Sequence, residues 1–282
     1  MKLESILRPL QMAPRRKQGL MLADLHNHIS KATPIKRILE ISSHGVLGVT
    51  RHVIMRDTTY TYDGLFQRLS ECAETDPRVE IAELEQGFAK VEYSSPQGDR
   101  EGYILQTNES FAGRSHIVTI GGSTPPLRID SDKIPDLKKS GSLVLLAHPF
   151  EINSRGFMTQ FYTDRKLNKH PETQADILRV AETVDAIESF NAQWPIPYRH
   201  CNEMAVRLAE QLGLPQVQNT DNHPYQLAEF RTGIYISEPK GIREIKDAIK
   251  NNEFLKGPKS YVPMPRLVMS YLILLAQHHP VN

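Results

Sequence analysis

The sequence predicts an α/β fold in which helices cover a parallel sheet. Short apolar runs that end in polar residues recur along the chain, and amphipathic stretches with helical spacing lie between several of them. Short buried strands that alternate with helices are typical of a parallel sheet, which is either open or closed into a barrel. With 282 residues, the chain is long enough for one large domain or for two small ones.

The expected strands and helices alternate through most of the chain. The apolar runs that we predict to be strands are 21–25, 46–50, 103–106, 116–121, 143–147, 184–188 and 215–220. The stretches with helical spacing are 35–43, 62–72, 134–139, 176–183 and 202–212. Two polar segments, 92–102 and 153–172, interrupt this rhythm and are expected to be surface loops, a kind of segment that often binds ligands.

The absence of repeats and of a clear linker in the sequence favours one domain, which we place at residues 21–257. A basic N-terminal arm, residues 1–20, precedes it, and a C-terminal extension, residues 258–282, contains a short apolar helix. The most apolar stretch of that extension, 267–276, is about half the length of a membrane-spanning helix. We expect it to cover part of the core or to join a partner subunit.

Composition is that of an ordinary globular protein, with 39% hydrophobic and 24% charged residues. The 34 basic and 33 acidic residues give a net charge of +1, which requires neither a nucleic acid nor a membrane as partner. Two cysteines, Cys72 and Cys201, fit a reducing compartment. Since no secretory signal is visible either, we expect a cytoplasmic protein without membrane contact or a stable nucleic-acid partner.

Many of the predicted strands end in residues that bind metal ions. The first run ends in Asp24-Leu25-His26-Asn27-His28, and alternation along a strand puts both histidines on the same side. The last run ends in Thr220-Asp221-Asn222-His223. Mixed carboxylate and imidazole ligands suit zinc, manganese or iron. Because the carboxyl ends of parallel strands meet at one face, we expect an active site there.

Further candidates lie at the ends of other runs. They are His52 in Thr50-Arg51-His52, Glu109 after 104–108, His116 at the start of 116–121, and His148 in Ala147-His148-Pro149. Glu92 is a rival to Glu109. Each of these residues, taken alone, is more often an ordinary surface or packing residue. The other five histidines, His44, His170, His200, His278 and His279, lack such a setting and are expected to be ordinary.

The order of these motifs resembles that of the PHP family, the polymerase and histidinol phosphatase domain, over residues 21–250. That family opens with D-x-H-x-H and continues with T-D-H, a Glu and a His, A-H-P, E-x-x-N and S-D-x-H. The matching residues are Asp24, His26 and His28, then Thr50-Arg51-His52, Glu109 or Glu92 with His116, Ala147-His148-Pro149, Glu188-Ser189-Phe190-Asn191 and Thr220-Asp221-Asn222-His223. Gly233 and a final helix at 242–249 also follow the family pattern.

The resemblance implies a distorted TIM-like barrel of seven β/α units with its active site at the carboxyl ends of the strands. It implies two or three divalent ions, manganese, zinc or iron, and hydrolysis of phosphate esters. The ligands that it implies are His26, His28, His52, Glu109, His116, His148, Asp221 and His223, with Glu109 and Asp221 as the catalytic carboxylates. Two departures, Thr33 in place of an Asp or His and Arg51 in place of an Asp, weaken one metal position unless another residue such as Asp57 completes it.

The function predicted from the sequence is hydrolysis, by metal-activated water, of a small phosphomonoester, a nucleotide or a short oligonucleotide. The phosphate needs a cationic partner, and the candidates are Arg51, Arg56, Arg155, Arg199 and Arg231. Two alternatives remain open. Thr33 and Arg51 also fit a non-catalytic phosphate- or metal-binding module, and histidine-rich barrels also include metal-dependent amidohydrolases.

Overall fold

The computed structural model describes residues 12–52, 57–153, 159–161, 164–193, 195–222 and 231–261. Its principal strands are β2 (Leu20–Asn27), β3 (Val46–Arg51), β6 (Gly98–Ala112), β7 (Ser115–Ile120), β9 (Leu143–Ala147), β12 (Ala186–Asn191) and β13 (Gln216–Asn219). The helices are α2 (Ile35–Ser42), α3 (Tyr62–Thr75), α4 (Ile134–Lys139), α5 (Asp164–Leu167), α6 (Pro171–Ala181), α7 (Pro195–Leu212) and α8 (Ile242–Lys250). All the strands and helices predicted from sequence periodicity are present. Strand β6 extends beyond the predicted strand 103–106 at both ends, and α6 and α7 begin five and seven residues earlier than predicted.

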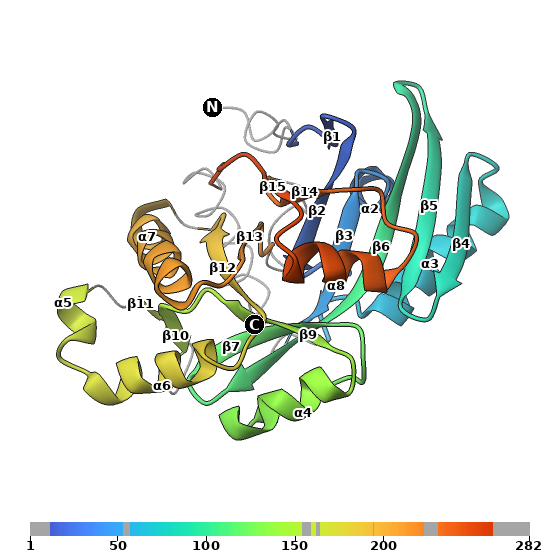
Figure 1. Cartoon of the computed structure of the whole chain (residues 1–282). Coiled ribbons are helices and arrows are strands. Elements are labelled where there is room, and N and C mark those ends of the chain that lie inside the picture. The colour runs from blue at the N-terminus through green and yellow to red at the C-terminus, as the bar shows by residue number, and fades with distance from the viewer. Residues whose placement is uncertain are drawn as a thin grey trace, which may run out of the picture.

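The seven principal strands form one curved sheet that is nearly closed into a barrel (Figure 1). Their order is β13-β12-β9-β7-β6-β3-β2, after which β14 (Ile234–Ile236) and β15 (Leu255–Lys256) continue the sheet beyond β2. Strand β13 also returns to the side of β2, where Asn27 and Asn222 form a parallel bridge. The prediction of a distorted TIM-like α/β barrel is therefore confirmed.

One strand of the barrel runs against the others, so the expectation of a wholly parallel sheet is wrong at this point. Strand β7 pairs antiparallel with both β6 and β9. Only Gly113 and Arg114 separate β6 from β7, and a connection that short makes a hairpin, whereas parallel strands need a crossover of a dozen residues or more. The amino end of β7 consequently lies at the same edge as the carboxyl ends of its parallel neighbours.

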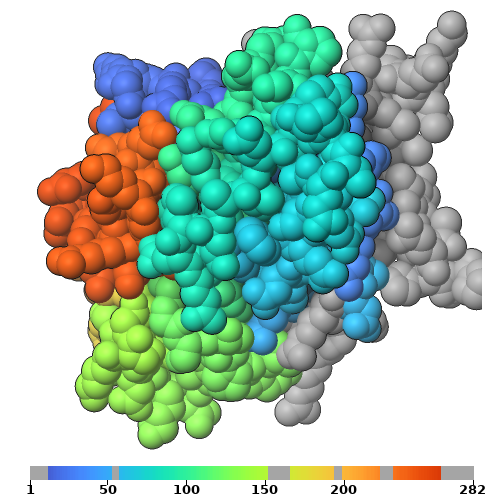
Figure 2. Space-filling model, turned by 90° about the vertical axis from the view of Figure 1, so that its right-hand side faces the viewer, coloured from blue at the N-terminus to red at the C-terminus, as the bar shows by residue number. Residues whose placement is uncertain are grey.

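The polar segment 92–102 is a β-hairpin, which corrects the expectation of a surface loop. Strand β5 (Phe88–Ser95) pairs antiparallel with β6 throughout this segment, and β4 (Val79–Glu85) pairs with β5. These strands extend the sheet away from the barrel (Figure 1). Figure 2 looks onto this side, where α3 and the β4–β5 hairpin form the surface with α8 beside them. The segment 153–172 lies partly outside the described residues, and it includes β11 (Thr159–Phe161) and α5.

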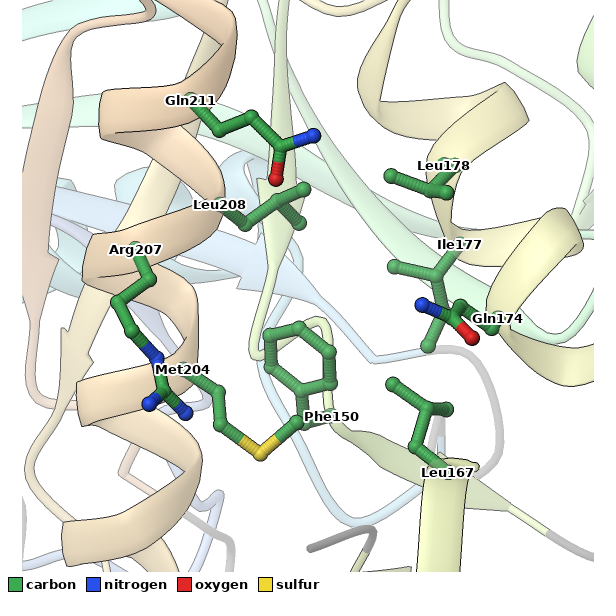
Figure 3. A pocket seen from close by; sticks show the side chains of 9 residues that line it. All are labelled: Phe150, Leu167, Gln174, Ile177, Leu178, Met204, Arg207, Leu208 and Gln211. Atoms are coloured by element: carbon green, nitrogen blue, oxygen red, sulfur yellow. The ribbon is translucent and has the colours of Figure 1, made fainter. Parts of the chain in front are cut away.

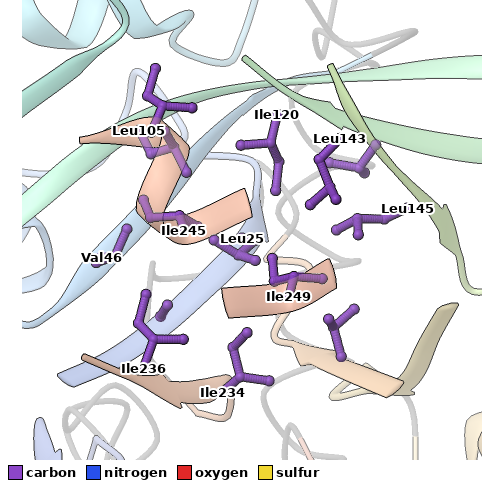
Figure 4. Close-up of a cluster of buried hydrophobic side chains, with 14 of the residues drawn as sticks. Leu25, Val46, Leu105, Ile120, Leu143, Leu145, Ile234, Ile236, Ile245 and Ile249 are labelled. Carbon is purple, nitrogen blue, oxygen red and sulfur yellow. The ribbon is translucent and has the colours of Figure 1, made fainter. Parts of the chain in front are cut away.

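The core is divided between the inside and the outside of the barrel. The inside is filled by aliphatic residues from most strands, among them Val46, Leu105 and Leu145, and Ile245 and Ile249 of α8 close it at the amino ends of the strands (Figure 4). Helices α2 and α3 pack on one part of the outer face, and α4, α6 and α7 on another. The opposite end, where the polar motifs meet, is therefore the end left for chemistry.

The N-terminal residues of the described chain are attached to the barrel. Strand β1 (Arg16–Lys17) pairs with β2, and Arg16 forms ion pairs with Glu101 and Glu238. After α2, the Nε2 atom of His44 donates to the carbonyl oxygen of Ala13 at 2.7 Å. Among the described residues, none of the helices combines the length and apolar character needed to cross a bilayer.

His44 makes the stability of the fold depend on pH. Its burial disfavours the charged imidazole and lowers its pKa from 6.5 to about 4. A depressed histidine pKa contributes stability that is present above the unfolded value of 6.5 and is lost progressively as the pH falls from that value to the folded value of about 4. We expect this group to cost about 2 kcal/mol of unfolding free energy between pH 7 and pH 5.

Urea unfolding of the wild type and of His44→Gln at both pH values measures this effect. The amide of Gln can still donate a hydrogen bond to Ala13 but does not titrate, and all other titrating groups are common to both proteins. The difference in unfolding free energy between pH 7 and pH 5 should therefore be smaller in the variant. An equal pH dependence in the two proteins would show that His44 is not responsible.

Candidate metal centre

The structure brings most of the predicted ligands together at one end of the barrel. They are His26 and His28 at the end of β2, His52 after β3, Glu109 on β6, His116 on β7, His148 after β9 and Asp221 after β13. All seven side chains are buried. His116 joins the others although it begins its strand, because β7 runs in the opposite direction. His223 lies outside the described residues.

A β-bulge aims the end of β2 into this cluster. The register between β2 and β3 shifts between Asp24 and Asn27, so that Leu25 and His26 lie opposite the single residue Gly48. A Cβ atom at Gly48 would lie 2.5 Å from the carbonyl of Leu25, so only glycine allows the two strands to come this close. Bulges near active sites commonly redirect a side chain in this way. Leu25 can thereby fill the core while the next residue, His26, reaches the site.

The imidazoles of His26 and His28 converge on one carboxylate oxygen. Their Nε2 atoms lie 3.2 Å apart, and each lies 3.4 Å from Oδ1 of Asp221. Two nitrogen atoms and an oxygen atom that face the same point are an arrangement that a cation between them would stabilise.

Glu109 connects this group with a second one. Its Oε2 lies 3.7 Å from Nε2 of His28. Its Oε1 lies 2.5 Å from Nδ1 of His116 and 3.8 Å from Nε2 of His148. In two sets of three residues, each residue offers a ligand atom that lies within 4.8 Å of the other two. One set is His26, His28 and Glu109, and the other is Glu109, His116 and His148. One carboxylate therefore belongs to two groups that can each hold a divalent ion.

Acceptors outside these two groups orient the imidazoles of His26 and His28, and a carboxylate lies within ion-pair distance of a third imidazole, that of His148. Nδ1 of His28 lies 3.1 Å from the carbonyl oxygen of Thr50. Nδ1 of His26 lies 3.2 Å from Oε1 of Glu188, and Nδ1 of His148 lies 3.2 Å from Oε2 of Glu151. In each case the other ring nitrogen, Nε2, is directed to the cluster.

The two glutamates in these contacts were not among the predicted site residues. For Glu188 a signal existed, because it opens the E-x-x-N motif after a predicted strand. Glu151 also offers a ligand atom that lies within 4.8 Å of ligand atoms of His148 and Asp221. Its only signal in the sequence is its place three residues after His148, which is weak because an acidic residue in a loop is usually solvated.

Hydrogen bonds across the closure of the barrel join the first and the last motif. We call this contact between the end of β2 and the end of β13 the seam. Its bonds run from Leu25 N to Asn219 Oδ1 (2.9 Å), Thr220 N to Asp24 Oδ1 (2.9 Å), Asp221 N to His26 O (2.8 Å), and His28 N to Asn222 O (2.9 Å). Two of these four bonds use a side-chain oxygen in place of a backbone carbonyl. The seam thus fixes Asp221 directly beside His26 and His28.

Two site residues have unusual backbone conformations. His148 and Asp221 adopt positive φ angles of 26° and 51°, which non-glycine residues seldom do. Such conformations persist where the surrounding structure holds them, and they concentrate at functional sites. The chain just after His148 is anchored by Phe150. The ring of Phe150 inserts between α6 and α7 beside Met204 (Figure 3), and its carbonyl oxygen accepts a hydrogen bond from Cys201 Sγ at 3.7 Å.

The electrostatics of the cluster favour positive charge. Burial alone would raise the pKa of Glu109, but His116, and then other imidazoles of the site, hold it well below its ordinary value. Burial likewise opposes ionisation of Glu188, whose pKa is nevertheless lowered by His26 and His148. Desolvation disfavours a charged His26, yet neighbouring carboxylates, with Asp221 first, raise its pKa to about 10. Buried carboxylates of this kind require a nearby cation.

The remaining predicted residues are less directly placed. The ring of His52 lies 4.4 Å from that of His28, centroid to centroid. Glu92, the rival of Glu109, lies on the distant hairpin, where it contacts Lys90. Thr33 is buried and Asp57 is exposed.

Three of the predicted phosphate-binding arginines can be located. Arg51 donates from Nη2 to the carbonyl oxygen of Pro125 at 2.7 Å. Arg199 is exposed and lies 3.5 Å from Glu203. Arg231 is buried, its backbone N donates to Oγ1 of Thr220, and its Nη1 donates to the carbonyl oxygen of Tyr261 at 3.3 Å. Of these three arginines, Arg231 is therefore the one that lies next to Thr220, the first residue of the last motif. Arg56 and Arg155 lie outside the described residues.

Comparison with known proteins finds similar folds but no close relative. No protein-family model and no curated protein matches the sequence. A solved two-domain protein from Bacteroides vulgatus that contains a predicted PHP-like metal-dependent phosphoesterase is 15% identical, with a TM-score of 0.48 over 88% of this chain and 68% of that one. A candidate metal-dependent phosphoesterase from Bifidobacterium adolescentis is 11% identical, with a TM-score of 0.36 over 74% of this chain and 88% of that one. Both of these solved structures are described as metal-dependent phosphoesterases, and the first also as PHP-like.

Proposed function

We propose that this protein is a metal-dependent phosphoesterase that hydrolyses a phosphate ester with a metal-activated water. The observation that carries the proposal is the convergence of four imidazoles and two carboxylates, all buried, at the end of the barrel where the strand ends meet. The residues are His26, His28, His116, His148, Glu109 and Asp221. This donor set of nitrogen and oxygen atoms fits zinc, manganese or iron. Active sites of barrel proteins form at the same end.

The contacts support two ion positions that share one carboxylate. His26, His28 and Asp221 would hold one ion, and His116 and His148 would hold the second, with Glu109 between them. His52 and His223 are the remaining ligands in this proposal. Thr33 and Arg51 supply no carboxylate or imidazole, so a third position would depend on those two histidines and on residues such as Asp57. Two ions suffice for an in-line displacement at phosphorus.

The protein residues have definable tasks in such a reaction. Bound ions would lower the pKa of a water molecule and neutralise phosphate oxygens. Glu109 and Asp221 would supply negative charge at fixed points, which keeps the ions in place while the ester bond breaks. The Nδ1 contacts of His26, His28 and His148 would keep their Nε2 atoms aimed at the centre. Burial would exclude bulk water and strengthen these interactions.

For substrate, we propose a small phosphomonoester, a nucleotide or a short oligonucleotide. Arg231 is favoured as the cationic partner by its burial beside Thr220, ahead of Arg51 and Arg199, while Arg155 remains a further candidate. A screen of phosphorylated metabolites, with manganese, zinc and iron varied, tests the proposal. Release of phosphate from p-nitrophenyl phosphate in the presence of manganese would separate hydrolysis from a purely binding role and from an amidohydrolase. Failure of every ester under every metal would refute the proposed activity.

Metal content tests the ligand assignment directly. Purified wild-type protein should carry manganese, iron or zinc, as measured by mass spectrometry of the metals. The double variant His26→Ala and His28→Ala should lose most of it, because water replaces imidazole nitrogen poorly as a ligand. His170→Ala with His200→Ala is the matched control. Both histidines are half-exposed, and each lies close to the carboxylate of a helical glutamate, Glu172 or Glu203. Equal metal content in the two double variants would contradict the assignment.

Turnover tests the role of Asp221. Replacement by Asn preserves the size of the side chain but removes its charge, so phosphate release should fall by a factor on the order of 100 or more. The control is Asp136→Asn, which changes an exposed carboxylate paired with Lys139 and should leave turnover unchanged. Wild-type turnover in the Asp221 variant would place the chemistry elsewhere.

A further inference from the structure

Glu188 of β12 has a fully occupied carboxylate at the back of the candidate metal centre. Its Oε1 lies 3.2 Å from Nδ1 of His26 and accepts from Nδ2 of Asn219 at 2.9 Å. Its Oε2 accepts from the backbone N of His148 at 2.9 Å and from Nδ2 of Asn191 at 3.1 Å. A carboxylate offers about four lone-pair positions, and here each oxygen has two partners.

These contacts constrain the imidazole of His26. An ionised carboxylate can only accept, so the proton between Glu188 and His26 belongs to Nδ1 of the histidine. When an ion replaces the proton on the other nitrogen, Nε2, the lone pair of Nε2 faces the cluster, where Nε2 lies 3.2 Å from that of His28. Partners of this kind fix both the tautomer and the ring orientation of a metal-binding histidine.

The same carboxylate is connected to Asp221 through Asn191. The two hydrogens of the Asn191 amide nitrogen serve different acceptors, Oε2 of Glu188 at 3.1 Å and Oδ2 of Asp221 at 2.9 Å. Glu188 therefore contacts two of the proposed ligands directly, the ring of His26 and the backbone N of His148. It is linked to a third, Asp221, through the Asn191 amide. The register between β12 and β13 shifts at Ser189, so a bulge lies between Glu188 and Phe190 of the E-x-x-N motif.

We infer that Glu188 is a positioning residue of the metal centre, which holds His26 in the tautomer that presents Nε2, and that it is not itself an ion ligand. The inference rests on the proposed function. The rival assignment is that Glu188 binds an ion together with His26 and His148, since ligand atoms of these three lie within 4.8 Å of one another. That assignment would require Glu188 to give up at least one of its four contacts.

Metal affinity of Glu188→Gln is the principal test. Isothermal titration of metal-free protein with manganese or zinc should show binding about 10–100-fold weaker than that of the wild type, the usual effect of losing a partner behind a ligand. The amide of Gln presents only one acceptor oxygen, so it cannot satisfy both the ring of His26 and the other three donors.

Asp185→Asn is the matched control. Asp185 Oδ2 accepts from the backbone N of Val144 at 2.9 Å at the start of β9, as Glu188 accepts from His148 just beyond the end of that strand. Both replacements remove a carboxylate that bonds to the backbone of the same segment, but only Glu188 adjoins the metal centre. Metal affinity of the Asp185 variant should equal that of the wild type, whatever its effect on unfolding by urea.

A double-mutant cycle separates positioning from ligation. If Glu188 acts through His26, most of the loss caused by Glu188→Gln should vanish in a His26→Ala background. An equal loss in both backgrounds would overturn the inference and favour direct ligation. If Glu188→Gln does not fold, Glu188→Asp replaces it, because Asp keeps the buried charge but draws it away from the ring. Unchanged affinity in the Asp variant would also overturn the inference. A wild type that binds no metal would instead refute the proposed function.

Discussion

The closure of the barrel at the seam is the contact on which the candidate site depends. The first and last barrel strands meet there through hydrogen bonds that include the side chains of Asp24 and Asn219. Without this contact, His26 and Asp221 would lie on the first and the last of the seven principal strands, at opposite ends of their order and 195 residues apart in the chain. With it, a carboxylate oxygen stands 3.4 Å from an imidazole nitrogen, and the carboxyl-terminal motif becomes part of the same site as the amino-terminal one.

Much of the fold and most residues of the candidate site follow from the sequence, for physical reasons. A buried strand reads as a short apolar run, and a parallel arrangement puts the ends of such runs at one edge, so the polar residues after them predict a common site. The direction of β7 was not predicted, although the two-residue connection at Gly113 and Arg114 could have indicated a hairpin. The hairpin at 92–102 was missed because its polar, turn-rich tip resembles a loop.

The supporting residues of the site are harder to predict than its candidate ligands. Glu188 and Glu151 gain their importance from partners that lie on other elements, and nothing in the spacing of the sequence records those partners. Glu92 is a false candidate of the opposite kind, because the sequence could not distinguish it from Glu109. Both are acidic residues beside an apolar run, but one lies on an exposed hairpin and the other among buried imidazoles.

The hairpin between β6 and β7 divides the assembly of the site into an early and a late event. Glu109 and His116 are seven residues apart and become neighbours as soon as one local turn forms, which takes microseconds in an isolated hairpin. His26 and Asp221 meet only after the whole intervening chain has been ordered, and such non-local contacts form slowly. An ion that needs ligands from both pairs binds only the finished barrel. By mass action it would then stabilise that state against partly folded ones, so metal supply would also control how much of the chain is folded.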